Sequence, residues 1–357
     1  MDKYFLYITI IDILILAMMC VMASYNVILL KKQKHGFILS FVVIGLISIA
    51  EVITVISDGA ALQFSSIHIH ANYFGFAFTP LIPLLISYSI DSTKKIRFPL
   101  IFIIAYEMFL AISVPFGWVF YVDASNAYSR GPLFSVYLIV YLLSIAYLFW
   151  ASIQMASKYH NRNRVLLYLL LAFLVFGTAV QVINPEIHVT WLCVTLVSVI
   201  YYNYCNELWQ QVDGLTGILN HQSYLNYTAS LNKDALLIIF DVDDFKQIND
   251  TYGHPVGDKC LISVAKCIRK AYGRHGYCYR IGGDEFCVLM FDASEIEKCS
   301  SDFCTLLEAE REQLIELPYV SIGTASFHRG DNIDDVKDKA DQQMYLYKQQ
   351  RKAEWQG

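Results

Sequence analysis

Two acidic segments of the sequence contain the residue types that can hold a metal ion. One is 241–244 (DVDD), directly after an apolar run, and the other is Asp284 with Glu285, directly after Gly282 and Gly283. Glycines at a tight turn permit positive φ and let a phosphorylated ligand approach the backbone without meeting a side chain. Carboxylates beside such a turn can hold Mg²⁺, a hard cation that prefers oxygen ligands and substrate phosphates. The two segments therefore indicate metal-assisted chemistry on a small phosphorylated molecule, if the fold brings them together.

The elements that would position these segments alternate between helix and strand in the second half of the chain. The run 235–242 is almost continuously apolar up to Asp241, as expected of a central strand. Runs at 277–281 and 285–291 predict a hairpin that turns at Gly282 and Gly283. The predicted fold class of this half is an α+β sandwich, with helices around a mainly antiparallel sheet. The other expected elements are helices near 222–231, 245–251, 256–272, 294–315 and 333–352, and a strand near 319–327.

The composition divides the chain into two chemically different halves. Of its 357 residues, 56% are hydrophobic and 15% are aromatic, which is too apolar for an ordinary soluble domain. Residues 1–205 contain 11 Lys and Arg against 8 Asp and Glu, whereas residues 206–357 contain 16 against 24. The first half therefore belongs in lipid, and the acidic second half lacks the basic surface that a nucleic acid requires. We expect a membrane domain at 1–205, a short helical linker at 206–212 and a soluble domain at 213–357.

Seven apolar stretches of the first half are long enough to cross a membrane, for which about 20 residues are needed. The first stretch begins at the N-terminus without a basic flank or a small-residue cleavage site, so we expect a retained helix and not a signal peptide. The predicted fold class of this half is a seven-transmembrane α-helical bundle. The stretches lie at 4–30, 36–57, 71–90, 98–116, 132–154, 165–183 and 188–204.

The loops between these stretches predict the orientation of the bundle, because Lys and Arg accumulate on the cytoplasmic side. Basic clusters follow the first, third and fifth stretches, whereas the alternate loops hold only Arg130 and the N-terminal tail only Lys3. We therefore expect a multi-pass protein of the inner or plasma membrane, with its N-terminus outside and its C-terminal half in the cytoplasm. The clusters are Lys31, Lys32 and Lys34; Lys94, Lys95 and Arg97; and Lys158, Arg162 and Arg164.

Three carboxylates, Asp12, Glu51 and Glu107, fall inside the predicted spans, all in the outward-facing half of the bilayer. An ionisable group at the centre of a membrane helix costs about 2.5 to 3.5 kcal/mol on insertion scales. Two explanations stay open, namely hydrogen bonding between helices and a shared polar cavity for an unknown ligand. Histidines in or near the outer loops could bind a metal, although exposed loop histidines usually do not. They are His68, His70 and His188.

The last apolar stretch leads toward the second half of the chain. It ends in aromatic residues at 201–204, which suit a membrane interface. No Pro or Gly interrupts 192–212, so the helix is expected to continue into the cytoplasm and to couple the two domains. We expect two copies of the chain to meet along it.

The segment 280–286 (RIGGDEF) resembles the signature of the GGDEF family of diguanylate cyclases. Five specified residues would match by chance in only roughly one chain in several thousand of this length. Other segments similar to family motifs follow in order, and the resemblance covers about 213–352. They are 213–220 (DGLTGILN), 241–250 (DVDDFKQIND), 251–254 (TYGH) with Gly257 and Asp258, 320–323 (VSIG), and 339–341 (KAD) with Tyr345 and Lys348.

The first half has a resemblance of its own. The segments 73–78 (YFGFAF) and 131–134 (GPLF) are similar to the seven-helix N-terminal sensor region of some membrane histidine kinases and cyclases. This resemblance implies a sensor architecture and identifies no ligand.

The GGDEF resemblance implies a reaction and a role for each site residue. Two GTP would condense into cyclic di-GMP and two pyrophosphates, each 3′ hydroxyl attacking the other nucleotide's α-phosphate, so a homodimer would be required. The implied metal is Mg²⁺, or Mn²⁺, held by Asp241, the carbonyl of Val242 and Asp284, with Glu285 for a second ion. Asp284 would also help to deprotonate the 3′ hydroxyl. The remaining implied contacts are Asn249 and Asp258 to the guanine edge with His254 close by, Lys246 and Lys348 to phosphates, and Gly282 and Gly283 to the nucleotide.

Three positions depart from the family pattern. The family's inhibitory product site, Arg-x-x-Asp, corresponds here to Gly273 and Gly276, so we expect no product inhibition through that site. The pair at 221–222 replaces two arginines, and the pair at 351–352 replaces Gly-Arg. Neither change removes an implied metal ligand or a residue that reads the base.

Three alternative functions are also consistent with parts of the sequence. A non-catalytic receptor for GTP or cyclic di-GMP is disfavoured because Asp241, Asp284, Asn249 and Asp258 are all present. A cyclase that accepts ATP is disfavoured because Asp258 can accept two hydrogen bonds from the guanine N1 and exocyclic amine. A transporter with a regulatory tail is disfavoured because the seven stretches show no inverted repeat or pair of broken helices.

Overall fold

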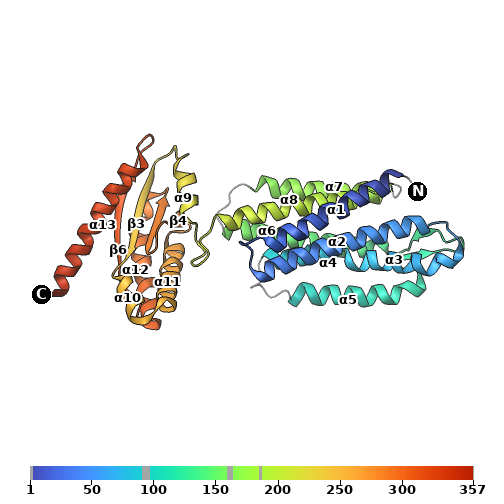
Figure 1. Cartoon of the computed structure of the whole chain (residues 1–357), viewed down its shortest axis with the longest axis horizontal. Coiled ribbons are helices and arrows are strands. Elements are labelled where there is room, and N and C mark those ends of the chain that lie inside the picture. The colour runs from blue at the N-terminus through green and yellow to red at the C-terminus, as the bar shows by residue number, and fades with distance from the viewer. Residues whose placement is uncertain (1–2, 91–96, 159–163, 185–186, 357) are drawn as a thin grey trace. The chain divides into compact units, whose positions relative to one another are not determined.

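The computed structural model describes residues 3–90, 97–158, 164–184 and 187–356, and the chain divides into two compact units, Met1–Gln210 and Gln211–Gly357 (Figure 1). Part of the basic pattern that predicts the orientation lies outside the described residues. This applies to Lys94, Lys95 and Arg162, and to the side chains of Lys3, Arg97 and Lys158; the side chains of Arg351 and Lys352 are likewise outside.

The N-terminal unit is a bundle of helices with one small hairpin (Figure 1). Within the described residues, six helical segments are long and apolar enough to cross a membrane, at Tyr4–Tyr25, Lys31–Ser57, Leu62–Ile90, Pro99–Phe116, Phe134–Ser157 and Val165–Ile183. The elements are α1 Lys3–Tyr25, α2 Lys31–Ser57, η1 Leu62–Phe64, α3 Ser65–Phe78, α4 Leu81–Ile90, α5 Arg97–Ser113, η2 Val114–Phe116, β1 Phe120–Val122, β2 Tyr128–Arg130, α6 Phe134–Lys158, α7 Val165–Ile183 and α8 Thr190–Gln210.

The surface of this bundle is rich in apolar side chains. On α1, for example, Tyr7, Ile10, Leu14, Met18 and Val21 are all exposed. An apolar surface of this extent is unfavourable in water and suits contact with lipid. The helical unit therefore has both the helix lengths and the surface of a membrane domain.

The predicted seventh span is a helix, but it is more polar than the other six. It corresponds to α8, which continues through most of the expected linker and ends at Gln210. Its aromatic residues, which suit a membrane interface, are buried inside the unit at Tyr201, Tyr202 and Tyr204. The Tyr202 hydroxyl accepts a hydrogen bond from Asn26 Nδ2 at 3.0 Å. The Tyr201 hydroxyl likewise shares a hydrogen bond with Ser152, so these two tyrosines make polar contacts between helices.

Two features of the bundle differ from the expected pattern. The third predicted span divides into α3 and α4 at Thr79 and Pro80, because proline lacks the N–H group that helix continuation needs. The loop between α5 and α6 contains the antiparallel hairpin β1–β2, with Phe120 opposite Arg130. Short hairpins of this kind give little periodic signal in a sequence.

The C-terminal unit contains a four-stranded antiparallel sheet with the strand order β4-β5-β3-β6. The predicted mainly antiparallel sheet is therefore confirmed, and β3 has the bounds expected from its apolar run. β3 is central, so residues at its end have neighbours on both β5 and β6. The strands are β3 Ala235–Val242, β4 Gly276–Arg280, β5 Glu285–Met290 and β6 Val320–Phe327.

Helices cover both faces of this sheet (Figure 1). On one face, Ile238 and Phe240 of β3 pack in a core with α11 and α12; on the other, Leu237 and Ile239 pack in a core with α9 and α13. This alternation follows from the two-residue period of a strand and places Asp241 on the α13 face. The helices are α9 His221–Thr228, α10 Phe245–Tyr252, α11 His254–Tyr272, α12 Ile296–Gln313 and α13 Ile333–Gln356, with a short η3 at Ala293–Glu295.

Candidate functional site

The two acidic segments lie side by side at one end of the sheet. Asp241, near the end of β3, pairs with Glu285, the first residue of β5. The backbone N–H of Val242 donates a hydrogen bond to the carbonyl oxygen of Asp284 at 3.2 Å. The structure thus brings together the backbone of all four residues expected to form the metal site.

The glycine turn between β4 and β5 is held by a neighbouring ion pair. The Arg280 guanidinium lies 3.0 Å from Asp213 Oδ1 and donates a 2.7 Å hydrogen bond from its other terminal nitrogen to the Gly283 carbonyl. Burial would raise the pKa of Asp213, but hydrogen bonds from Thr216 and Arg280 outweigh it, so the pKa lies below its ordinary value of 3.8. The carboxylate of Asp213 is therefore ionised and fixes Arg280 beside the turn.

The physical role expected for the two glycines needs correction. Neither Gly282 nor Gly283 has the positive φ that the expected tight turn would require. A β-carbon added at Gly283 would meet no atom within 4 Å, whereas one at Gly282 would lie 3.0 Å from Glu285 Oε2. Gly283 thus keeps an open approach to the backbone, which agrees with the expected access for a phosphorylated ligand.

A lysine from the last helix reaches the acidic end of β3. Lys348 Nζ lies 2.5 Å from Asp241 Oδ1 and 3.2 Å from Asp243 Oδ1. Ser321 Oγ, on β6, donates a 2.8 Å hydrogen bond to the same Asp243 oxygen. Burial would lower the pKa of Lys348, but its hydrogen bond to Asp241 and the two negative charges outweigh burial and raise that pKa. Lys348 is therefore charged and bound to a residue that was expected to hold a metal.

The residues expected to read the guanine edge come from α10 and the start of α11. A β-carbon added at Gly257 would lie 2.0 Å from Asn249 Oδ1, so the side chain of Asn249 packs directly against α11 at this glycine. Asp258 is the next residue and is exposed, and His254 is exposed one turn before it. Lys246 lies exposed in the first turn of α10. The structure therefore places Asn249 close to the helix that carries Asp258.

The donor set at the end of β3 and the glycine turn fits a hard cation in chemical type. Asp241, Asp284 and Glu285 offer carboxylate oxygens, and Val242 offers a carbonyl oxygen, the ligands that Mg²⁺ prefers. In the part of the chain that the structure describes, no three His, Cys, Asp or Glu side chains gather closely enough to hold a metal. The three carboxylates therefore do not form a complete cage, and further ligands would have to come from substrate phosphates and water.

Sequence reasoning assigned no role to several residues that hold this site. Asp213 and Arg280 were part of the matching motifs, but nothing in the sequence showed that they pair across 67 positions. Asp243, just after β3, and Ser321, on β6, likewise lie in different matching motifs. A signal was available in the type of residue, because an arginine directly before a glycine turn can hydrogen-bond the carbonyls of that turn.

The buried acidic residues of the helical unit lie among different helices. Glu51 Oε1, on α2, accepts a 2.7 Å hydrogen bond from Gln181 Nε2 and lies 3.0 Å from His188 Nδ1. Asp12 is on α1, which packs on α2 and α8, whereas Glu107 is on α5, which packs on α3 and α6. The contacts thus favour helix-to-helix hydrogen bonding for Glu51 over a cavity shared by all three.

The other outer-loop histidines also make local contacts. His68 is fully buried on α3, with Nδ1 3.2 Å from Asn126 Oδ1 of the hairpin. His70 Nδ1 lies 2.6 Å from the Ser66 carbonyl, within the same helix. Neither contact indicates a metal site.

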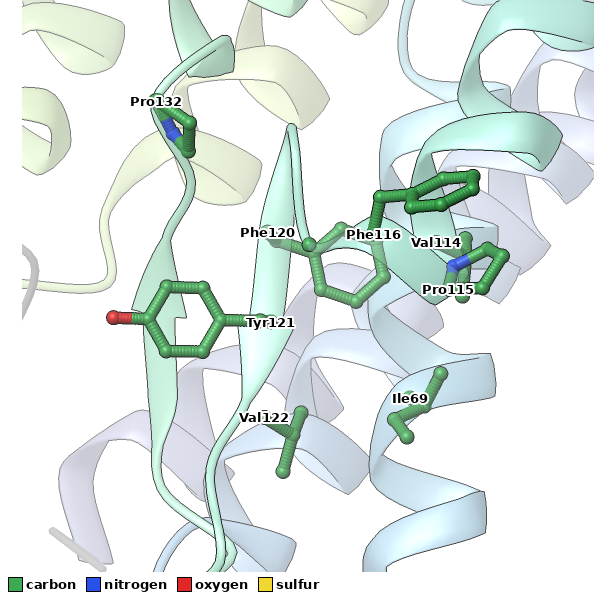
Figure 2. Close-up of a pocket in the computed structure, with 9 residues that line it drawn as sticks. Ile69, Val114, Pro115, Phe116, Phe120, Tyr121, Val122 and Pro132 are labelled. Carbon is green, nitrogen blue, oxygen red and sulfur yellow. The ribbon is translucent and has the colours of Figure 1, made fainter.

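The helical unit has a pocket between α3, η2 and the β1–β2 hairpin, whose lining side chains are drawn in Figure 2. Its volume is about 470 Å³. Ile69, Val114 and Val122 give it an aliphatic wall, and Phe116 and Phe120 add aromatic rings. A pocket of this volume is large enough for a small molecule. Asp12, Glu51 and Glu107 are not among the residues that line it.

Residues 210–354 match the family model described as the GGDEF domain of diguanylate cyclases. The match coincides with the C-terminal unit and confirms the GGDEF domain that the sequence predicts. The helical unit lies outside the matched segment.

The chain is also similar to parts of several curated proteins. Diguanylate cyclase DgcN of Escherichia coli strain K12 is 32% identical over 156 residues, which are 39% of this chain and 37% of that protein. A diguanylate cyclase of Vibrio cholerae is 30% identical over 38% of this chain and 46% of that protein. An uncharacterized membrane protein of Staphylococcus saprophyticus is 31% identical over 43% of this chain and 42% of that protein. This chain thus spans less than half the length of these relatives.

Among solved structures, the GGDEF domain of DgcB from Caulobacter crescentus, in complex with c-di-GMP, is 26% identical. The match covers 39% of this chain and 88% of the DgcB chain, with a TM-score of 0.35.

Proposed function

We propose that this chain is a membrane-bound diguanylate cyclase, which condenses two GTP into cyclic di-GMP and two pyrophosphates. One observation carries the proposal: inside a GGDEF domain, the segments of Asp241 and Asp284 meet beside the open backbone of Gly283. The similarity to proteins named as diguanylate cyclases supports the same activity.

In this proposal Asp241, the Val242 carbonyl and Asp284 would hold Mg²⁺ or Mn²⁺, and Glu285 would serve a second ion. A bound cation would supply positive charge at the triphosphate. The Lys246 and Lys348 ammonium groups would add to that charge by contacting phosphate oxygens. Lys348 already lies among these carboxylates, which supports its assignment to the site.

The protein groups would act mainly by positioning the substrates. Asp284 would accept the proton of the 3′ hydroxyl, whose oxygen then attacks the α-phosphorus of the facing GTP. The bond from that phosphorus to the bridging oxygen breaks, and pyrophosphate leaves. Asn249 and Asp258 would read the guanine edge with His254 near them. Because each site holds one GTP, the reaction needs a homodimer with two facing sites.

The helical unit would anchor the enzyme in the membrane and sense an unidentified ligand. We propose that α8 is a seventh span in addition to the six apolar segments. Two of its polar side chains have partners within the unit, since Tyr201 and Ser152 share a 2.7 Å hydrogen bond and Asn26 donates to Asn206 Oδ1 at 2.9 Å. Seven spans would place the N-terminus outside and the GGDEF domain in the cytoplasm, where GTP is available.

The test is to incubate the purified full-length protein with GTP and Mg²⁺ and to measure cyclic di-GMP by chromatography and mass spectrometry. The wild type should form the product, and Asp284→Ala should not. Asp302→Ala, which removes an exposed carboxylate on α12, is the matched control and should keep full activity.

Two outcomes would count against the proposal. Equal product from the wild type and Asp284→Ala would remove the assigned mechanism. No product from the wild type, with GTP still bound, would favour the non-catalytic receptor. Addition of EDTA to the wild type should stop the reaction, and excess Mg²⁺ or Mn²⁺ should restore it.

A further inference from the structure

An ion pair closes the acidic end of β3. Lys348 Nζ contacts both Asp241 Oδ1, at 2.5 Å, and Asp243 Oδ1, at 3.2 Å. The side chains are 27%, 17% and 10% exposed for Lys348, Asp241 and Asp243, so bulk solvent screens their attraction only in part. The positive charge of Lys348 is thus held where a metal ligand was expected to be free.

The fold builds this position through close packing of α13 on the sheet. A β-carbon added at Gly323 of β6 would lie 2.0 Å from the Ala340 carbonyl oxygen and 2.7 Å from the Met344 nitrogen. Only glycine therefore lets α13 approach β6 this closely. Lys348 follows Met344 by one helical turn, so it lies on the same side of α13 and reaches the end of β3.

The second carboxylate of the pair is itself anchored. Asp243 is buried, and its Oδ1 accepts the hydrogen bond from Ser321 on the adjacent strand. A buried carboxylate needs such partners to remain charged. The hydrogen bond from Ser321 thus fixes Asp243 as a second partner for Lys348 beside Asp241.

We propose that Lys348 exchanges partners when the nucleotide binds, leaving Asp241 for the triphosphate and so opening that carboxylate to the metal. The inference rests on the proposed function and concerns the order of binding at the same site. Without nucleotide, Lys348 neutralises Asp241, and a divalent cation at the same oxygen would be repelled by the ammonium group. With nucleotide, the phosphates offer Lys348 an equivalent negative partner. Metal and GTP therefore bind together, and metal alone binds weakly.

Asp243 and Ser321 are positioning residues in this scheme. They hold Lys348 near the phosphate site when it has left Asp241, since Asp243 still offers a carboxylate at the edge of that site. One of the expected metal ligands is occupied by a protein cation until the substrate arrives.

The experiment measures Mn²⁺ binding to the full-length protein in detergent, after removal of bound metal, by electron paramagnetic resonance of the free ion. Without nucleotide, Lys348→Met should bind Mn²⁺ roughly tenfold more tightly than the wild type, at the lower end of the effect of a neighbouring cation on a carboxylate. Lys348→Arg keeps the charge and should bind as weakly as the wild type. Lys298→Met removes a distant exposed lysine of α12 and should change nothing. Asp241→Asn in the Lys348→Met background should abolish the tighter site.

A second titration measures the coupling between metal and nucleotide. The probe is a GTP analogue with a methylene group between its α- and β-phosphorus atoms, which cannot lose pyrophosphate. It should raise the Mn²⁺ affinity of the wild type by a larger factor than that of Lys348→Met, because coupling is reciprocal and the variant has no ion pair to release.

The results separate this inference from the proposed function. If wild type and Lys348→Met bind Mn²⁺ equally without nucleotide, while the wild type binds the analogue and forms cyclic di-GMP from GTP, the exchange is wrong and the function stands. If the wild type neither binds the analogue nor forms cyclic di-GMP, the proposed function fails, and the exchange fails with it.

Discussion

Arg280 links the glycine turn to the start of the GGDEF domain, because its guanidinium contacts Asp213 at 3.0 Å and the Gly283 carbonyl at 2.7 Å. Different terminal nitrogens of the guanidinium bind the two partners, so one side chain links them. Both members of the ion pair are mostly buried, with 15% and 23% of the side chains exposed. The turn that should contact the nucleotide is therefore fixed by a partly buried ion pair.

We predict that Arg280→Met lowers the rate of cyclic di-GMP formation by roughly ten- to a hundredfold, because a small displacement of the turn misplaces Asp284. Asp213→Asn should lower it in the same way. In the double variant the increase in activation free energy should be smaller than the sum of the two single increases, by a coupling energy of about 0.5 to 3 kcal/mol. Arg274→Met, at an exposed arginine of the loop before β4, is the control and should be as active as the wild type. Full additivity of the two changes would contradict this role.

The ion pair of Asp213 and Arg280 should also affect the stability of the protein in acid. The pKa of Asp213 is lower in the folded protein than its ordinary value, so its stabilising effect is fully present above that ordinary value of 3.8 and disappears as the pH falls through the lower, folded value. The difference in Tm between wild type and Asp213→Asn should be constant from about pH 7 to about pH 5 and should shrink below about pH 4. A difference that grows in acid would show that the carboxyl is stabilised in its protonated form.

The contact between Asn249 and α11 predicts a substrate-binding defect. In Gly257→Ala the added methyl group would lie 2.0 Å from Asn249 Oδ1 and must displace that side chain. Alanine has the higher helix propensity, by about 1 kcal/mol, so local helix stability is not the expected loss. The KM for GTP should rise roughly tenfold with a smaller change in kcat, as for the loss of one hydrogen bond to the base. Gly214→Ala, where a methyl group meets open space, should leave the KM unchanged.

Product inhibition through the family's upstream site should be absent. A titration with cyclic di-GMP should show no strong non-competitive inhibition, and Arg274→Ala should leave the response unchanged. The structure adds a reason why the site is difficult to restore, since a β-carbon at Gly276 would lie 2.3 Å from the Leu289 carbonyl oxygen of β5. We expect Gly276→Asp to lower the Tm. Strong inhibition that depends on Arg274 would overturn the prediction.

The proposed orientation can be measured with a membrane-impermeant maleimide on right-side-out vesicles. Ala124→Cys places a thiol on the exposed tip of the β1–β2 hairpin, and native Cys304 is an exposed thiol of the C-terminal unit. The hairpin cysteine, in a Cys304→Ser background, should react in intact vesicles. Cys304 of the wild type should react only after permeabilisation. The reverse pattern would place the GGDEF domain outside and remove its access to GTP.

The sequence predicted the C-terminal fold well because its elements are marked by local patterns. The apolar run that becomes β3 has the predicted bounds, and the hairpin β4–β5 and helix α13 lie within a few residues of those expected. The pairing of Lys348 with Asp241 was not predictable, because the two residues are separated by 107 positions and meet only through the packing of α13. The φ values of Gly282 and Gly283, which are not positive, were not predictable, since a glycine signals freedom of the backbone and not the conformation adopted.

The helical half shows a different limit. Hydropathy located the six apolar segments, but it could not show that Tyr201 and Tyr202 face inward, because tyrosine suits both a membrane interface and a polar contact between helices. The partners of Glu51 could not be predicted either, since Gln181 and His188 lie 130 and 137 positions away. Single-sequence patterns describe a helix and give no information on its neighbours.

The close seat of α13 on β6 at Gly323 has a practical consequence for handling the protein. Within the described part of the chain, Lys348 of α13 is the only cation in contact with Asp241. Lys348 lies far beyond the signature motif in the sequence. A truncation a few residues before Lys348 would preserve every strand of the sheet and still alter the site. Purification tags and fluorescent fusions therefore belong at a distance from this end, joined through a long flexible spacer.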